Sequence, residues 1–467
     1  MTAQPDVALS ADPAGLSPWA VFAIACGGVF LVSLDVTIAI AAFPALRTAF
    51  PDSSPADLSW VLNAYTILYA ALLVPAGRLV DLYGAKSLFI LGIALFTLAS
   101  AACGLAPSPQ ALIASRIVQA VGGALLTPSS LTLILAAFPP EKRAPVVGLW
   151  GAVGALAAAL GPGIGAGLID LAGWRAAFLV NLPVGLWLVW IGQARLHTTA
   201  TAQTGARLDP PGVALIIIGV AALTYGIVLI EDLGWQAFQV RAAIATGLTA
   251  LAGYIVWARG RANATIDLTL FRDRTYAFVT AATFVFGIAF SMMFLGAFLF
   301  LLGIWNLGQT LTGLAMMPGP LAVIPVAILG GRIAARTGHR PLLVTGGALY
   351  ALAQVTLAMF ITETPDFLTL WLPLQILGGV SVGLLLPGLA GAAVARLPPH
   401  RFGVGGAVNN AMRQLGAVIG TAIAVVLVGA PDSPVESFRQ LFMILAVLGA
   451  VSGLLCLPVN TRPVPRH

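Results

Sequence analysis

An aspartate lies deep inside an apolar stretch of this chain. Asp35 follows the start of residues 18–46 by 17 positions, which in a helix is a depth of roughly 25 Å. A charge at that depth in a bilayer costs about several kcal/mol unless it is paired or faces water. A carboxylate whose surroundings alternate between two states can take up and release a proton. We therefore predict that Asp35 is a proton site, with a structural hydrogen bond between helices as the alternative.

An arginine in another apolar stretch is placed to meet that carboxylate. Arg116 lies near the start of residues 110–138, about 9 Å from that end of the segment. This depth is similar to that of Asp35, so Arg116 can pair with it and change its affinity for protons. The alternative is that the side chain extends to the lipid headgroups, which its shallow depth allows.

A charged loop bounded by glycines occurs twice. The first copy contains Gly77, Arg78, Asp81, Gly84 and Lys86, and the second contains Gly331, Arg332, Gly338 and Arg340. We predict that these residues form charge pairs at helix ends and latch one conformation. A purely topogenic role explains the basic residues but neither Asp81 nor the glycine spacing. Ala335 replaces the aspartate in the second copy, so the second latch should be weaker or different.

The elements that must position these residues are membrane helices. Hydrophobic residues make up 59% of the 467 residues and charged residues only 9%, which excludes an ordinary soluble protein. Apolar blocks long enough to cross a bilayer as helices cover residues 18–46, 57–77, 87–106, 110–138, 144–168, 175–194, 210–230, 240–258, 275–304, 310–334, 341–361, 367–395, 403–430 and 438–458. The sequence thus predicts an all-α integral membrane protein with fourteen spans.

Several motifs recur in the same order in the second half of the chain. Besides the two loops, residues 119–123 correspond to residues 375–379, and residues 139–143 to residues 398–401. Such repeats are typical of transporters that rock around a central site. We predict a six-helix bundle over residues 1–196, two inserted helices over residues 197–274 and a second six-helix bundle over residues 275–467.

The basic residues indicate the orientation. Most of the 23 lysines and arginines fall on segments that lie on the same side as Met1. The positive-inside rule therefore predicts that both termini are cytoplasmic. The excess of basic residues has this explanation, so we do not expect nucleic-acid binding. The preference for arginine over lysine fits a bacterial genome, and we expect the inner membrane of a bacterium.

The fifth predicted span is rich in small residues. Gly154, Gly161, Pro162 and Gly165 allow close helix packing and a kink. Such a helix suits a hinge or a seal between halves, although small-residue stripes are also common packing devices. Arg413 lies near the middle of the thirteenth span; it is expected either to bind an anionic or carbonyl group in the cavity or to bond to helix ends.

A central cavity needs adaptable apolar surface and a few polar groups. The candidates are Trp60, Asn63, Tyr65, Gln119, Asn181, Met292, Met293, Phe294, Asn409, Arg413 and Gln414. For any one of them, packing or lipid contact is the alternative. The three cysteines and four histidines have no metal-ligand spacing, and there is no Walker-type motif. We expect no metal, no cofactor and no enzymatic activity.

Together these residues resemble the fourteen-span drug:proton antiporters of the major facilitator superfamily. The loop at residues 77–86, Asp35 with its neighbours Leu34 and Thr37, Arg116 and the fifth-span glycines are similar to that family's motifs. The resemblance implies the major facilitator fold, a role for Asp35 and Arg116 in proton coupling, and an antiporter motif in the fifth helix. It is strongest over residues 30–185. No carboxylate occurs in the last six predicted spans, which argues against export of dications.

We therefore predict a monomeric, proton-coupled antiporter that exports small hydrophobic or amphipathic compounds across the lipid bilayer by alternating access. One alternative is an exporter dedicated to a single cellular metabolite or lipid. Another is a membrane receptor that transports nothing.

Overall fold

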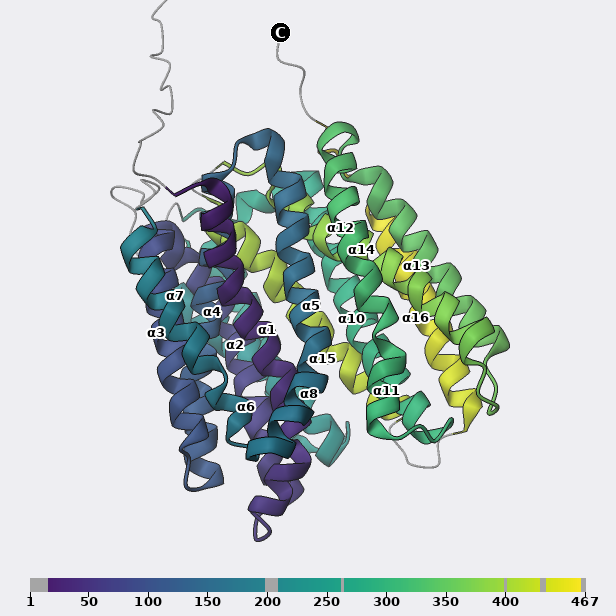
Figure 1. The fold of residues 1–467 in the computed structure, drawn as a ribbon. Helices are drawn as coiled ribbons and strands as arrows, with labels where there is room; N and C mark the ends of the chain where they lie inside the picture. Colours follow the sequence, from purple (N-terminus) through teal and green to yellow (C-terminus); the bar gives the residue numbers. More distant parts are fainter. Residues whose placement is uncertain (1–15, 198–208, 262–263, 399–400, 429–433, 463–467) are drawn as a thin grey trace, which may run out of the picture.

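The computed structural model describes residues 16–197, 209–261, 264–398, 401–428 and 434–462. In these residues the chain forms a bundle of long helices (Figure 1). The helices are α1 (Pro18–Ala49), α2 (Pro55–Tyr83), α3 (Ala85–Gly104), α4 (Pro109–Ala137), α5 (Pro140–Ala172), α6 (Ala176–Leu179), α7 (Asn181–Arg195), α8 (Pro210–Leu233), α9 (Phe238–Ala258), α10 (Arg274–Gly303), α11 (Gln309–Met316), α12 (Pro318–Thr337), α13 (Arg340–Phe360), α14 (Leu372–Val394), α15 (Phe402–Val428) and α16 (Val435–Leu455). A 3-10 helix, η1 (Leu268–Arg272), precedes α10, and a π-helix, η2 (Phe367–Trp371), precedes α14.

Several helices begin at a polar residue followed by proline. Ser17, Ser54, Ser108 and Asp209 each accept a hydrogen bond from a backbone N–H of the first turn, and a proline follows each. The side chain satisfies one of the free N–H groups at a helix start, and proline suits this place because it needs no donor there. These signals fix where α1, α2, α4 and α8 begin.

The helices coincide with the predicted spans. In the described residues, 13 helices are long and apolar enough to cross a membrane. The fifth predicted span is α5, a helix of 33 residues in which some side chains lie outside the described residues. Three predicted spans are each divided into two helical segments in the structure. These pairs of segments are α6 and α7, α11 and α12, and η2 and α14. The all-helical membrane fold is confirmed, and the helix limits differ from the predicted ones by several residues.

The helix contacts follow the same pattern in both halves. In the first half α1 packs on α5, while α2 and α3 pack on α4; in the second half α10 packs on α15, while α12 and α13 pack on α14. Figure 1 shows the two groups side by side, purple to teal and green to yellow. The α8–α9 pair packs together, and α8 also contacts α2 and α15. The boundaries 1–196, 197–274 and 275–467 remain a prediction.

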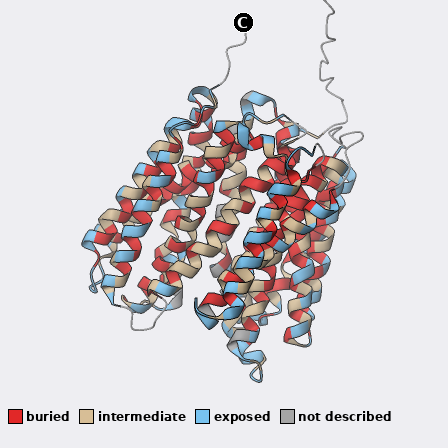
Figure 2. Ribbon diagram, turned by 180° about the vertical axis from the view of Figure 1, so that it is seen from behind, coloured by how far each residue is buried: buried red, intermediate tan, exposed pale blue. Residues whose placement is uncertain are grey.

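The two halves meet closely at one end of the bundle. We call this end, where α1 begins and α16 ends, the termini face (Figure 1). There Gly77 of α2 packs against Gly403 of α15, and Gly148 of α5 packs against Ala327 of α12. Glycine is required at these crossings because a Cβ on either would lie less than 3 Å from the facing helix. Figure 2 shows buried residues concentrated between the helices and exposed ones on the outside and at the ends.

Candidate functional site

A buried polar cluster surrounds Asp35 on α1. Its Oδ2 accepts a hydrogen bond of 2.5 Å from Nη1 of the Arg116 guanidinium, which forms an ion pair with it. Both side chains are only 1% exposed. Its Oδ1 accepts hydrogen bonds of 2.9 Å from Gln119 Nε2 and from Asn181 Nδ2. The carboxylate therefore has three donors from α4 and α7. This arrangement balances the loss of hydration that a buried charge would otherwise suffer.

A second set of contacts holds these donors in place. Ser100 of α3 accepts hydrogen bonds from Gln119 at 3.2 Å and Asn181 at 2.9 Å, and it donates to the carbonyl of Phe178 at 2.8 Å. The guanidinium of Arg116 also donates to Gln119 Oε1 and to a backbone carbonyl of α2, and it lies 4.2 Å from the ring centre of Tyr65. The site is thus built from α1, α2, α3, α4 and α7.

The start of α7 contributes directly to the site. Asn181 is the first residue of α7 and is fully buried. Its amide Nδ2 donates hydrogen bonds of 2.9 Å both to Ser100 Oγ and to Asp35 Oδ1. The sequence analysis proposed Gln119 and Asn181 for a substrate cavity. In this structure they bind the carboxylate, and their contact with substrate remains a prediction.

The glycines of α5 bring that helix against α1 close to Asp35. A Cβ added to Gly161 would lie 2.6 Å from Cβ of Thr37, and one added to Gly165 would lie 3.3 Å from Cα of Ile38. The side chain of Pro162 lies outside the described residues. Thr37 is two residues from Asp35, so the close α1–α5 contact lies within one helical turn of the carboxylate.

Asp81 joins the two halves at the termini face. Its Oδ1 accepts a hydrogen bond of 2.9 Å from the N–H of Gly403, and its Oδ2 accepts one of 2.8 Å from the N–H of Val404. These groups belong to the first turn of α15, where free N–H groups and the helix dipole favour a negative charge. Arg78 is close enough to act on the carboxylate electrostatically. The carboxylate binds a helix terminus, which differs from the predicted charge pairs.

The other latch residues have more local contacts. Gly84 and Gly338 both end a helix with positive φ, 88° and 79°, a conformation that favours glycine. Lys86 donates to the carbonyl of Gln193 at 3.5 Å. In the second copy, Gly331 is buried beside Gly148 of α5, and Arg332 and Arg340 are exposed. The latch role of both copies remains a prediction.

The predicted cavity residues differ in exposure. Tyr65, Gln119, Asn181, Met292 and Asn409 are buried; Trp60, Asn63, Met293, Arg413 and Gln414 are partly exposed; Phe294 is exposed. Met292 is fully buried within the core. The sequence analysis missed Ser100 because a serine in an apolar span is common. It also missed the backbone N–H groups that Asp81 binds, because no side chain marks them.

Comparison with known proteins decides the family. The family model described as Major Facilitator Superfamily matches residues 25–317 and 279–467. The chain belongs to the major facilitator superfamily. This transporter is 33% identical over 397 residues to the multidrug resistance protein Stp of Mycobacterium tuberculosis, covering 85% of this chain and 73% of that protein. It is also 33% identical over 415 residues to the methylenomycin A resistance protein of Streptomyces coelicolor, covering 87% and 85%.

A solved structure shares the fold. The proton:xylose symporter XylE superposes with a TM-score of 0.67 at 13% sequence identity, over 94% of each chain. At that identity the likeness concerns the fold alone. The family and the helices establish a multi-pass membrane transporter rather than an enzyme. Its relatives include proteins named for resistance to drugs and to an antibiotic.

Proposed function

We propose that this transporter exports small hydrophobic or amphipathic compounds in exchange for protons by alternating access. The observation that carries the proposal is the ion pair of Asp35 and Arg116, buried between helices that α5 contacts. Protonation of Asp35 removes its negative charge and so removes the attraction for Arg116. The pair therefore offers two states that differ by one proton.

The energy needed to separate this ion pair is comparable to the energy that one transported proton supplies. Removing one partner of a buried ion pair costs about 3–5 kcal/mol. One proton crossing 100 mV supplies about 2.3 kcal/mol, and each pH unit adds about 1.4 kcal/mol. A proton moving down both gradients thus supplies roughly the energy needed to separate the pair. An exposed ion pair contributes about 1 kcal/mol or less, so its protonation would not supply enough energy to drive such a conformational change.

We further propose that the termini face is cytoplasmic. The basic residues near this face are Arg78, Lys86, Arg332, Arg336, Arg396 and Arg401, and the positive-inside rule places such a cluster in the cytoplasm. The contacts of Asp81 with α15 then close the cytoplasmic side. Their release would open the path by which a compound enters from the cytoplasm or the inner leaflet.

The relatives named for resistance to drugs and antibiotics support export as the direction. An exporter dedicated to a single metabolite remains the second candidate, because a resistance protein named for methylenomycin A is among these relatives. We expect a monomer, since the cluster around Asp35 is complete within one chain.

The test is transport in proteoliposomes with an imposed pH gradient. The probes are rhodamine 123, Nile red and rhodamine 110, which cover cationic, neutral and carboxylate-bearing amphipaths. We expect gradient-driven transport of at least one probe by the wild type and none by Asp35→Asn. The control is Asp273→Asn, which removes a carboxylate of the termini face while asparagine can still cap α10. Equal transport with and without the gradient, or full activity of Asp35→Asn, would contradict the proposal.

A further inference from the structure

Arg413 is a charged residue in mid-helix that has no carboxylate partner among the residues that the structure describes. It is the twelfth residue of α15, about 17 Å from the start of the helix, and it is partly exposed. Its Nε and Nη2 donate to Asn410 Oδ1 at 3.1 and 2.8 Å. In the described residues its Nη1 makes no hydrogen bond. Asn410 is neutral, so the charge of the guanidinium is not compensated.

Two other charged side chains of the described helices have partners that balance them. Arg116 is paired with Asp35, and Asp81 binds the first turn of α15. The sequence contains no aspartate or glutamate in the last six predicted spans. Arg413 therefore leaves a net positive charge in the middle of the transporter. Intramembrane charges are costly, and an arginine kept there points to a functional partner.

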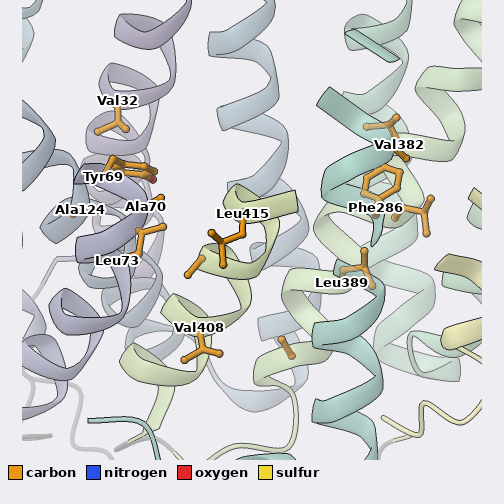
Figure 3. Close-up of a cluster of buried hydrophobic side chains, with 14 of the residues drawn as sticks. Val32, Tyr69, Ala70, Leu73, Ala124, Phe286, Val382, Leu389, Val408 and Leu415 are labelled. Atoms are coloured by element: carbon orange, nitrogen blue, oxygen red, sulfur yellow. The ribbon is translucent and has the colours of Figure 1, made fainter. Parts of the chain in front are cut away.

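The surroundings place this charge between the two halves. The backbone of Arg413 packs against Gly287 of α10. The helix α15 also packs on α2 of the first half, and Tyr69 of α2 acts electrostatically on Arg413. Figure 3 shows Tyr69 pointing from α2 toward the region where Leu415 of α15 lies. Tyr69 also donates to or accepts from Thr127 at 2.8 Å, which fixes its hydroxyl group.

Tyr69 also connects Arg413 with the proton site. Its ring stacks on Tyr65 at 5.8 Å between centres, with an angle of 9° between the planes. The guanidinium of Arg116 lies over the other ring of this pair. Two stacked aromatic rings, both buried in this structure, thus lie between the ion pair and the helix contact of α2 with α15. A flat amphipathic molecule with one anionic group matches such rings together with a guanidinium.

We propose that Arg413 binds an anionic group of the exported compound, so that this transporter prefers amphipathic carboxylates or sulfonates to cations. The inference rests on the proposed function for the direction of transport. A guanidinium binds a carboxylate through two parallel hydrogen bonds, which a lysine cannot reproduce. Exchange of one proton moving inward for one monoanion moving outward transfers two positive charges inward. The membrane potential then drives export together with the pH gradient.

The first test is binding to the detergent-purified full chain, measured by fluorescence anisotropy. Rhodamine 110 and its methyl ester rhodamine 123 differ in one carboxylate, and fluorescein and its methyl ester form a second such pair. In both pairs we expect the free acid to bind about tenfold more tightly than the ester, the effect of one charge-assisted contact. Arg413→Gln should remove the difference and Arg413→Lys should reduce it. Arg439→Gln, at the exposed start of α16, should leave it unchanged.

Two results of the binding experiment would overturn the inference: esters that bind the wild type as well as the acids do, or a preference for acids that survives in Arg413→Gln. The wild-type comparison decides the matter even if the variants do not fold. The second test is transport of fluorescein, an anion, in proteoliposomes with a valinomycin-imposed potassium potential, which should accelerate export at zero pH gradient. Failure of all gradient-driven transport with the binding preference intact would contradict the proposed function and leave this inference standing.

Discussion

Replacing Asp81 should shift the balance between the two conformations of this transporter. The carboxylate accepts two hydrogen bonds, of 2.9 and 2.8 Å, from the N–H groups of Gly403 and Val404. Each hydrogen bond to a charged group contributes about 1.5–3 kcal/mol. Because the two share one carboxylate, we take about 3 kcal/mol for both. Asp81→Ala should therefore lower the ratio of the closed to the open termini face about 100-fold.

Asparagine gives an intermediate case. Asp81→Asn keeps one oxygen acceptor but loses the charge and the second acceptor, so we expect a shift of about tenfold. The populations can be measured by double electron–electron resonance between spin labels at positions 83 and 336. Tyr83 of α2 and Arg336 of α12 are both exposed and lie in different halves. The native cysteines are buried, which limits background labelling.

The expected result is a longer distance between the labels in Asp81→Ala, with Asp81→Asn between it and the wild type. Asp273→Asn is the control, since that residue caps α10 within its own half and its loss does not touch the seam. Unchanged distances in a folded Asp81→Ala protein would show that the contact with α15 does not hold the halves together. If the control variant lengthened the label-to-label distance as much as Asp81→Ala does, the change could not be assigned to the contact between Asp81 and α15.

Three other predictions concern particular side chains. Arg116→Gln should lower the unfolding free energy by about 3–5 kcal/mol, because it leaves the buried charge of Asp35 unpaired. Adding Asp35→Asn to this variant should restore part of the thermal stability. A melting temperature of the double variant below that of Arg116→Gln would contradict this explanation. Gly161→Ala should reduce proton-driven transport, because the added methyl group meets α1, while Gly163→Ala, which has open space around it, should not; similar effects of both would count against a close α1–α5 contact. Burial lowers the pKa of His339 from 6.5 to about 4, so as the pH falls from 6.5 to 4 the unfolded chain binds a proton before the folded protein does, and the free energy of unfolding decreases by about 3 kcal/mol. In His339→Gln the melting temperature should therefore depend less on pH over this range. The same pH dependence in the variant and the wild type would argue against the effect.

Sequence reasoning located the membrane helices because apolar blocks of this length leave few alternatives. It also brought Asp35 and Arg116 together, since their depths in antiparallel helices match. It could not find the contact between Asp81 and α15. That contact depends on how two distant helices pack, and it uses main-chain N–H groups that every residue except proline carries.

The interrupted helices were not predicted for a similar reason. Residues 175–194 read as one apolar span, yet α6 ends at Leu179 and α7 begins at Asn181. The one residue between them, Val180, keeps helical dihedral angles, φ -59° and ψ -25°, so the boundary is local. The length of an apolar block predicts whether it can cross a bilayer but contains no information about such a local boundary.

The α8–α9 pair has a consequence for the lipids around the protein. Because α8 contacts both α2 and α15, and Trp60 of α2 lies against Tyr225 of α8 at 5.6 Å between ring centres, this hairpin covers one lateral seam between the halves. An acyl chain diffusing in the bilayer meets a helix there instead of a gap. Where α5 meets α12, by contrast, the two halves close directly on each other. The two lateral seams between the halves therefore differ in what they present to the lipids, although the two halves repeat the same helix packing.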